Sequence, residues 1–231
     1  MNTQPLKYLS SKIQAIGFDL DGTIVDSLPG IHQALNLALI ASELSPVDEY
    51  QTKGFIGNGI DILLRKTIET IKGSDAYYSF DFSSLRKRFD AFYSELMTDG
   101  TQLYPNVFST LHALKQKQIP LVLITNKPSQ FLPELLNGLG LSKMFCLVLG
   151  ADDVKEKKPH PAPIFQTLGS LGILTNEFLF VGDSKNDIEC AKNAGVLSVG
   201  LTYGYNYHQP IADAKPDFVF DDFAQLLNLF H

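Results

Sequence analysis

The sequence FDLDGT at residues 18–23 decides the fold prediction, because it closes a short apolar run with two carboxylates one residue apart. The run begins at Ile13, and apolar runs of this length that end in turn residues are typical of buried strands. Side chains alternate along a strand, so Asp19 and Asp21 can point the same way from its end. Two carboxylates in one small space repel each other unless a cation or a proton relieves them. A fold gains nothing from such a pair, so it indicates a function.

Composition and charge restrict the class of protein. The 231 residues are 45% apolar and 19% charged, which is ordinary for a globular chain with one sizeable core, or with a core and a smaller module. The net charge is −6, and no Arg-rich run is present, which disfavours nucleic acid as a partner. An anionic substrate would therefore need local cations, from lysine or from a metal ion.

The cysteines and the lengths of the apolar runs indicate the cellular compartment in which the protein is expected. Cys146 and Cys190 are far apart in apolar surroundings, so we expect buried thiols in a reducing compartment rather than a disulfide. Residues 1–11 lack the basic-then-apolar pattern of a secretory signal, and we expect a loosely held leader over residues 1–12. No apolar run approaches the ~18 residues of a membrane span. We therefore expect a cytoplasmic protein with no membrane partner.

Helical spacing dominates residues 27–103, where we find no strand pattern. One apolar face recurs through residues 60–68 and a second through residues 85–96, with the flexible sequence Gly57-Asn58-Gly59 before the first. After Tyr104 the apolar pattern alternates between strands and helices. Strands are expected at 119–125, 145–149, 178–181, 196–201 and 218–220, and helices at 107–117, 130–139, 162–171, 187–194 and 223–230. This alternation predicts an α/β fold with a parallel sheet, interrupted early by a helical insertion.

Four polar clusters fall at or near the ends of predicted strands, where ligands bind in open parallel sheets. The clusters are Asp19 with Asp21, Thr125 with Asn126, Lys158, and Asp183 with Asp187. Asp183 and Asp187 are four residues apart, which suits one face of a helix, and a few hard carboxylate oxygens suit Mg²⁺. Asp187 also fits a helix-start acid, and Thr125 also fits a helix cap.

These clusters resemble the four motifs of the haloacid dehalogenase superfamily, in order. FDLDGT resembles the first motif, Ile124-Thr-Asn126 the second, Lys158 the third and the sequence GDSKND at residues 182–187 the fourth. The sequences at residues 56–59, 125–128, 158–161 and 201–206 further resemble the bacterial phosphoglycolate phosphatases of that superfamily. The resemblance implies a Rossmann-like core, residues 1–26 and 104–231, with an inserted α-helical cap domain at residues 27–103.

The resemblance also implies a reaction, the Mg²⁺-dependent hydrolysis of 2-phosphoglycolate to glycolate and phosphate. Asp19 would be the nucleophile that forms an aspartyl-phosphate, and Asp21 would protonate the departing alkoxide and then activate water. Asp21 also favours phosphate chemistry, because the dehalogenases lack this second acid. Thr125 and the Asn126 amide would bind a phosphoryl oxygen, and Lys158 would balance the charge. The family links the reaction to salvage of 2-phosphoglycolate, including that released by repair of oxidised DNA ends.

The family assigns the metal ion to Asp19, the backbone carbonyl of Asp21 and the carboxylate of Asp183. We expect Asp187 to lie one shell out, or to act through water. Hard oxygen ligands of this kind would hold Mg²⁺, which offsets the repulsion between the carboxylates and the phosphate.

Specificity for a small phosphorylated acid must come from the cap. The backbone amides of Gly57, Asn58 and Gly59, or the guanidinium of Arg65, are candidates to bind the substrate carboxylate. Arg65 is equally consistent with a surface position on a helix. We expect a structural role for His160, which lies between two prolines.

Two further stretches receive no chemical role. Lys155 and Lys157 belong to a charge run and are expected to form a solvated face. The sequence TYGYN at residues 202–206 is expected to border the site or to pack a loop.

Three alternatives remain open at this point. The core motifs would look the same in a phosphatase of another small ester or of pyrophosphate, and in a phosphosugar mutase. A catalytically silent binding module of the same fold could dispense with Asp21 or Asp183, and both are present. Monomer and homodimer are both compatible with the sequence.

Overall fold

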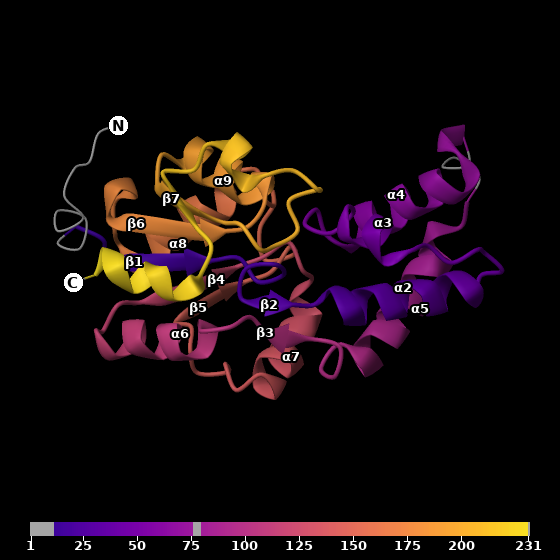
Figure 1. Ribbon diagram of the computed structural model, residues 1–231, viewed down its shortest axis with the longest axis horizontal. Coiled ribbons are helices and arrows are strands. Elements are labelled where there is room, and N and C mark those ends of the chain that lie inside the picture. Colours follow the sequence, from indigo (N-terminus) through magenta and orange to yellow (C-terminus); the bar gives the residue numbers. More distant parts are fainter. Residues whose placement is uncertain (1–11, 76–79, 231) are drawn as a thin grey trace.

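The computed structural model describes residues 12–75 and 80–230, so all but Lys12 of the expected leader lies outside the described residues. Figure 1 shows an α/β part built around a sheet and, at the opposite end of the long axis, a group of helices labelled α2 to α5. The division into a core and an inserted cap at residues 27–103 stays a prediction. In the described part of the chain, no helix is long and apolar enough to cross a membrane.

A six-stranded parallel sheet forms the α/β part, as the alternating sequence pattern predicts. Its strand order is β5-β4-β1-β6-β7-β8, with β1 between β4 and β6. The strands are β1 (Ala15–Phe18), β4 (Leu121–Ile124), β5 (Leu147–Leu149), β6 (Phe178–Gly182), β7 (Leu197–Leu201) and β8 (Phe218–Phe220). Phe18, the last residue of β1, is in register with Leu123 on one side and Val181 on the other, so three strands end close together.

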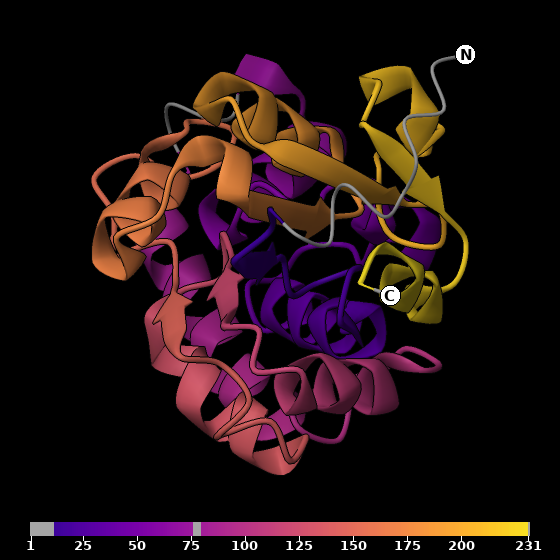
Figure 2. The ribbon, with the colours of Figure 1, turned by 90° about the vertical axis from the view of Figure 1, so that its left-hand side faces the viewer.

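Helices cover both faces of the sheet, as Figures 1 and 2 show. Alternate residues of β1 explain the two layers, because Ile16 and Phe18 join one buried apolar cluster while Ala15 joins another. The first cluster takes in residues of α6 (Val107–Gln116), α7 (Leu132–Gly138) and η5 (Phe223–Leu229). The second takes in residues of α8 (Ala162–Leu171) and α9 (Lys185–Ala194).

Some boundaries differ from the prediction. The expected last helix is the 3₁₀ helix η5, and the expected helix 130–139 is divided into η2 (Ser129–Phe131) and α7. Helix α9 begins at Lys185, two residues before the predicted start, because the chain turns directly after β6. Cys190 is buried as predicted, but Cys146, which directly precedes β5, is exposed, so that part of the cysteine prediction was wrong.

The inserted segment contains α2 (Leu28–Ile40), α3 (Glu49–Lys53), α4 (Ile60–Lys72) and α5 (Phe82–Leu96). Helices α2 and α5 pack together, and their buried residues continue the first apolar cluster. Two short strands, β2 (Val25–Asp26) and β3 (Gln102–Leu103), pair antiparallel where the chain enters and leaves the segment. The prediction of no strand within 27–103 was therefore wrong at β3, since two residues are too few to give a periodic pattern.

Candidate active site

Neighbouring strand ends bring the predicted polar clusters together. Asp19 follows β1, Thr125 follows β4 and Asp183 follows β6, and these three strands are adjacent in the sheet. All three side chains are buried. The apolar strand residues are held by the core, so each strand delivers the polar residue that follows it to the same edge.

Lys158 connects the clusters at the centre of the site. Its Nζ lies 2.7 Å from Asp19 Oδ1 and 2.6 Å from Asp187 Oδ1, and it donates a hydrogen bond to the Ile124 carbonyl at 2.9 Å. The side chain is 2% exposed. Burial disfavours its charge, but the two carboxylates outweigh burial and hold the pKa of Lys158 above its usual value. This ammonium is therefore a fixed positive charge inside the protein.

Asp19 is a buried acid that lies between the Lys158 ammonium and other carboxylates. Burial raises the pKa of Asp19 to about 7, while Lys158 lowers it and the Asp187 carboxylate raises it again. Its carboxylate is therefore poised between two protonation states near neutral pH, and a further cation would favour the ionised form.

Asp183 is held by contacts that leave little room to move. Its Oδ1 accepts a hydrogen bond from the Thr23 hydroxyl at 2.7 Å, and its Oδ2 accepts one from the Tyr205 amide at 2.6 Å. A Cβ added at Gly22 or Gly204 would lie 2.3 or 2.2 Å from Oδ2, so only glycine fits at either position. Burial, Asp187 and Asp19 raise the pKa of Asp183 well above its usual value.

The acidic cluster has the donor chemistry of a divalent cation site. Asp19, Asp183 and Asp187 each offer a carboxylate oxygen, and these atoms lie within 4.8 Å of one another, all buried. Hard oxygen donors packed this closely suit a divalent metal ion. Burial of several like charges costs free energy that such an ion would offset. The residues therefore fit a metal ion.

Asp187 has a second set of partners. Its Oδ2 accepts hydrogen bonds from the amide and the hydroxyl of Ser184 in the first turn of α9, at 3.0 and 2.6 Å, while Oδ1 faces Lys158. The sequence analysis left open that Asp187 is an acid at the start of a helix, and these bonds to Ser184 have that geometry. The carboxylate thus orients Lys158 as well as contributing charge to the acidic cluster.

Asp21 lies beside an ammonium that sequence reasoning did not assign to the site. Lys127 Nζ donates to both oxygens of Asp21, at 2.8 and 3.1 Å, and the Ser27 hydroxyl donates to Oδ1 at 2.6 Å. Lys127 comes two residues after Thr125, and its backbone amide donates to the Thr125 hydroxyl at 3.1 Å. Lys127 lies within the TNKP sequence at residues 125–128, and this is the feature from which its place in the site could have been predicted.

A pocket opens between the strand ends and the helical segment. It takes in about 470 Å³ of space not filled by atoms, and part of that space is open to solvent. The core side is polar and the helical side is mostly apolar. The lining residues are Asp19, Asp21, Thr125, Asn126 and Lys127 from the core, and Ile31, Ile56, Gly57, Gly59, Ile60, Leu63, Phe89 and Tyr93 from the segment.

The Gly57-Asn58-Gly59 loop touches the core directly. The Gly57 carbonyl accepts a hydrogen bond from Asn126 Nδ2 at 2.9 Å, and Asn58 Nδ2 donates to the Tyr207 hydroxyl at 2.9 Å. Lys157 Nζ donates to the Asn58 carbonyl at 2.8 Å. The solvated position predicted for Lys157 was therefore wrong, because the folded loop brings the inserted segment against it.

Arg65 lies on the outer side of α4. Its guanidinium pairs with Glu69 at 2.8 Å, its side chain is 47% exposed, and it does not line the pocket. This position matches the surface alternative. Lys155 and His160 are exposed, and His160 Nδ1 accepts a hydrogen bond from the Ala162 amide in its own loop, in keeping with the expected structural role.

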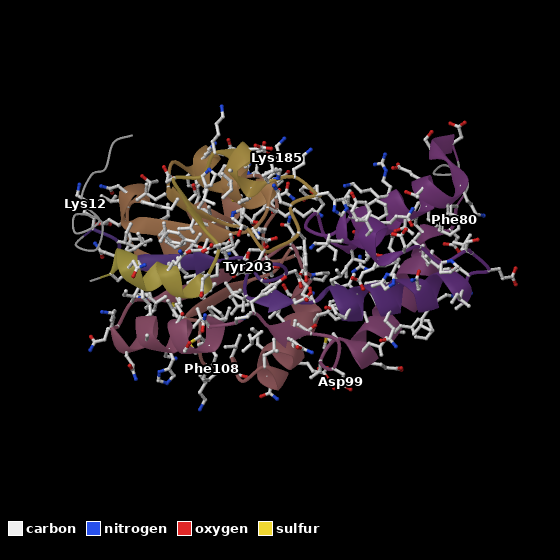
Figure 3. The ribbon with its side chains drawn as sticks, viewed as in Figure 1. Lys12, Phe80, Asp99, Phe108, Lys185 and Tyr203 are labelled. Carbon is white, nitrogen blue, oxygen red and sulfur yellow. The ribbon has the colours of Figure 1, made fainter. Side chains whose placement is uncertain are left out.

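The TYGYN sequence borders the site, as expected. Tyr203 is half-buried and donates its hydroxyl to the Thr23 carbonyl at 2.9 Å, and Figure 3 labels it near the middle of the view. The Tyr205 hydroxyl accepts hydrogen bonds from the Ser27 and Leu28 amides at 2.9 and 3.1 Å. This loop therefore ties Asp183 to the start of α2.

Comparison with known proteins agrees with the geometry. The model of the haloacid dehalogenase-like hydrolases matches residues 16–201. The chain is 46% identical over 216 residues to the phosphoglycolate phosphatase of Photorhabdus laumondii, covering 94% of this chain and 92% of that one. It is 43% identical over 221 residues to that of Pasteurella multocida, covering 95% and 99%.

A solved structure shares the arrangement. The crystal structure of a predicted phosphoglycolate phosphatase from Haemophilus somnus superposes with a TM-score of 0.90 at 39% identity, over 95% of this chain and 99% of that chain. The matched family model, the relatives and the shared fold all include the strands that carry the acidic cluster. The chain therefore belongs to the haloacid dehalogenase-like hydrolase family.

Proposed function

We propose that this protein is a Mg²⁺-dependent phosphatase that hydrolyses 2-phosphoglycolate to glycolate and phosphate. The observation that carries the proposal is the pair of acids at the end of β1, with the buried Asp19 against Lys158 and the partly buried Asp21 facing the pocket. The substrate is supported by the relatives in Photorhabdus laumondii and Pasteurella multocida, which are named phosphoglycolate phosphatase.

In the proposed reaction, a carboxylate oxygen of Asp19 attacks phosphorus and forms an aspartyl-phosphate, while the bond to the glycolate oxygen breaks. Asp21 gives its proton to that departing oxygen and then takes a proton from the water that attacks phosphorus. The second attack releases phosphate and restores the Asp19 carboxylate. The Thr125 hydroxyl, the backbone amide of Asn126 and the Lys158 ammonium hold the phosphoryl oxygens and balance their charge.

Asp19, Asp183 and the backbone carbonyl of Asp21 would hold Mg²⁺. The ion would offset the repulsion between these acids and the phosphate, as the crowded buried carboxylates require. Asp187 would lie one shell out, where its Oδ1 pairs with Lys158 and its Oδ2 accepts a hydrogen bond from Ser184.

We propose that residues 27–103 form a cap domain over a core of residues 1–26 and 104–231. The apolar pocket wall from α2, α4 and α5 would exclude water from the reacting groups. The amides of Gly57, Asn58 and Gly59 are candidate donors to the bound substrate. Arg65 is not assigned to the substrate, since it lies outside the pocket.

A panel of phosphate esters tests the substrate. We expect 2-phosphoglycolate to rank among the best by kcat/KM with Mg²⁺, ahead of pyrophosphate and of sugar phosphates. A poor rank for 2-phosphoglycolate would refute the specificity. Phosphate release without a bisphosphate activator excludes a mutase, which would instead return a rearranged sugar phosphate.

A pair of variants tests the nucleophile. Asp19→Asn should abolish turnover while the far-UV circular dichroism spectrum is retained. Asp99→Asn makes the same chemical change at an exposed residue, labelled in Figure 3, and should keep wild-type turnover. Substantial turnover by Asp19→Asn would remove Asp19 from the nucleophile role.

A further inference from the structure

The chemistry of the proposed substrate limits where its carboxylate can lie, and this inference rests on the proposed function. In 2-phosphoglycolate a single methylene separates the carboxylate from the ester oxygen. The ester oxygen must lie within hydrogen-bond distance of Asp21, the proposed proton donor. The group that binds the substrate carboxylate must therefore lie beside Asp21, within the reach of that short spacer.

Lys127 occupies this position. Its Nζ lies 2.8 and 3.1 Å from the two oxygens of Asp21, and its side chain is 3% exposed. It lines the pocket, and it is the one cation among the described residues that do so. The loop after β4 fixes it, because its backbone amide donates to the hydroxyl of Thr125, the proposed phosphate ligand. Lys127 is thus placed to reach the far end of a ligand whose phosphate is held by Thr125.

The surroundings of Lys127 make a cation necessary for an acidic ligand. Ile31, Leu63 and Phe89 form the apolar wall opposite, and the Tyr93 ring centroid lies 4.8 Å from Lys127 Nζ. A carboxylate that enters such a pocket loses its water and must be paired. Both oxygens of Asp21 face the Lys127 ammonium and supply the opposite charge that a buried ammonium needs.

We propose that Lys127 binds the carboxylate of the substrate, so that a core loop, and not Arg65 of the helical segment, distinguishes phosphorylated acids from neutral phosphate esters. Asp21 neutralises the ammonium when the pocket holds no ligand. A bound carboxylate then shares the ammonium with Asp21. A neutral ester offers no such partner.

The test compares kcat/KM for 2-phosphoglycolate with kcat/KM for 2-hydroxyethyl phosphate, which replaces the carboxylate with a hydroxymethyl group. Lys127→Met should lower the ratio of the two about 100-fold, the typical cost of losing a charge-assisted hydrogen bond in a buried site. Lys127→Arg, which keeps the charge, should restore part of the ratio. Lys155→Met makes the same change at an exposed lysine and should keep the wild-type ratio.

The outcomes separate two roles for Lys127. If it only positions Asp21, Lys127→Met will lower both kcat/KM values by the same factor, which overturns the inference. Lys127→Gln, which retains hydrogen-bond donors without charge, gives the same comparison if the methionine variant fails to fold. A wild-type enzyme that does not prefer 2-phosphoglycolate overturns the proposed function itself. A wild-type preference that survives in Lys127→Met and Lys127→Gln overturns this inference alone.

Discussion

Replacement of Lys158 by methionine tests how the buried charges of the site are balanced. Methionine keeps most of the apolar volume and removes the ammonium that faces Asp19 and Asp187 at 2.7 and 2.6 Å. Two buried carboxylates, each under 10% exposed, are then left without their cation. The Ile124 carbonyl also loses a donor.

The size of the effect follows from burial. Removal of one partner from a buried ion pair costs about 3–5 kcal/mol, and we expect the free energy of unfolding to fall by this amount at pH 8. The carboxylates of the variant can be relieved by a proton, so the loss should be smaller at pH 5. Lys185→Met is the matched control, because Lys185 is 58% exposed and lies 3.4 Å from Glu189 on the surface seen in Figure 3. It should change stability by about 0.5 kcal/mol or less.

The assay is urea unfolding of metal-free protein, followed by far-UV circular dichroism because the chain has no tryptophan. Wild type and both variants are compared at pH 5 and pH 8, with a chelator present. A loss below about 1 kcal/mol at pH 8 for Lys158→Met would contradict the argument that burial sets the cost. An equal loss at both pH values would show that the freed carboxylates do not take up a proton.

Three further predictions concern the metal site and the loop beside it. With a chelator present, the free energy of unfolding should fall as pH rises from about 4 to about 7. The folded-state pKa of Asp19 is raised from 3.8 to about 7, so the folded protein holds a proton that it loses over this range. Mg²⁺ competes with that proton, so it should raise Tm more at pH 8 than at pH 5, and equal shifts in a thermal melt would contradict a site at Asp19. Tyr205→Phe removes a hydroxyl that accepts from the Ser27 and Leu28 amides and donates to Asp26, and it should cost about 1–3 kcal/mol in urea unfolding. A cost no larger than that of Tyr50→Phe, an exposed tyrosine, would show that these bonds are replaced by solvent.

The sequence alone determined the layers of the fold and the positions of most polar clusters. Apolar runs such as the one before Asp19 must be buried, and each ends where turn residues begin, so local pattern is enough to locate a strand end. Parallel strands point their carboxyl ends to one edge, which is why Asp19, Thr125 and Asp183 could be expected to meet. The two-residue strand β3 and the exposure of Cys146 left no comparable pattern.

Only the tertiary structure decided which charges pair with which. Lys127 and Asp21 are 106 residues apart in the sequence, and the local pattern around Lys127 predicts only a lysine in a loop. Their contact depends on β1 and β4 being neighbours in the sheet, and residues of the inserted helices line the same pocket. Lys157 meets Asn58 for the same reason, because the inserted helical segment lies against the core. An ion pair requires two side chains at one point in space, and no local periodicity of the chain specifies that point.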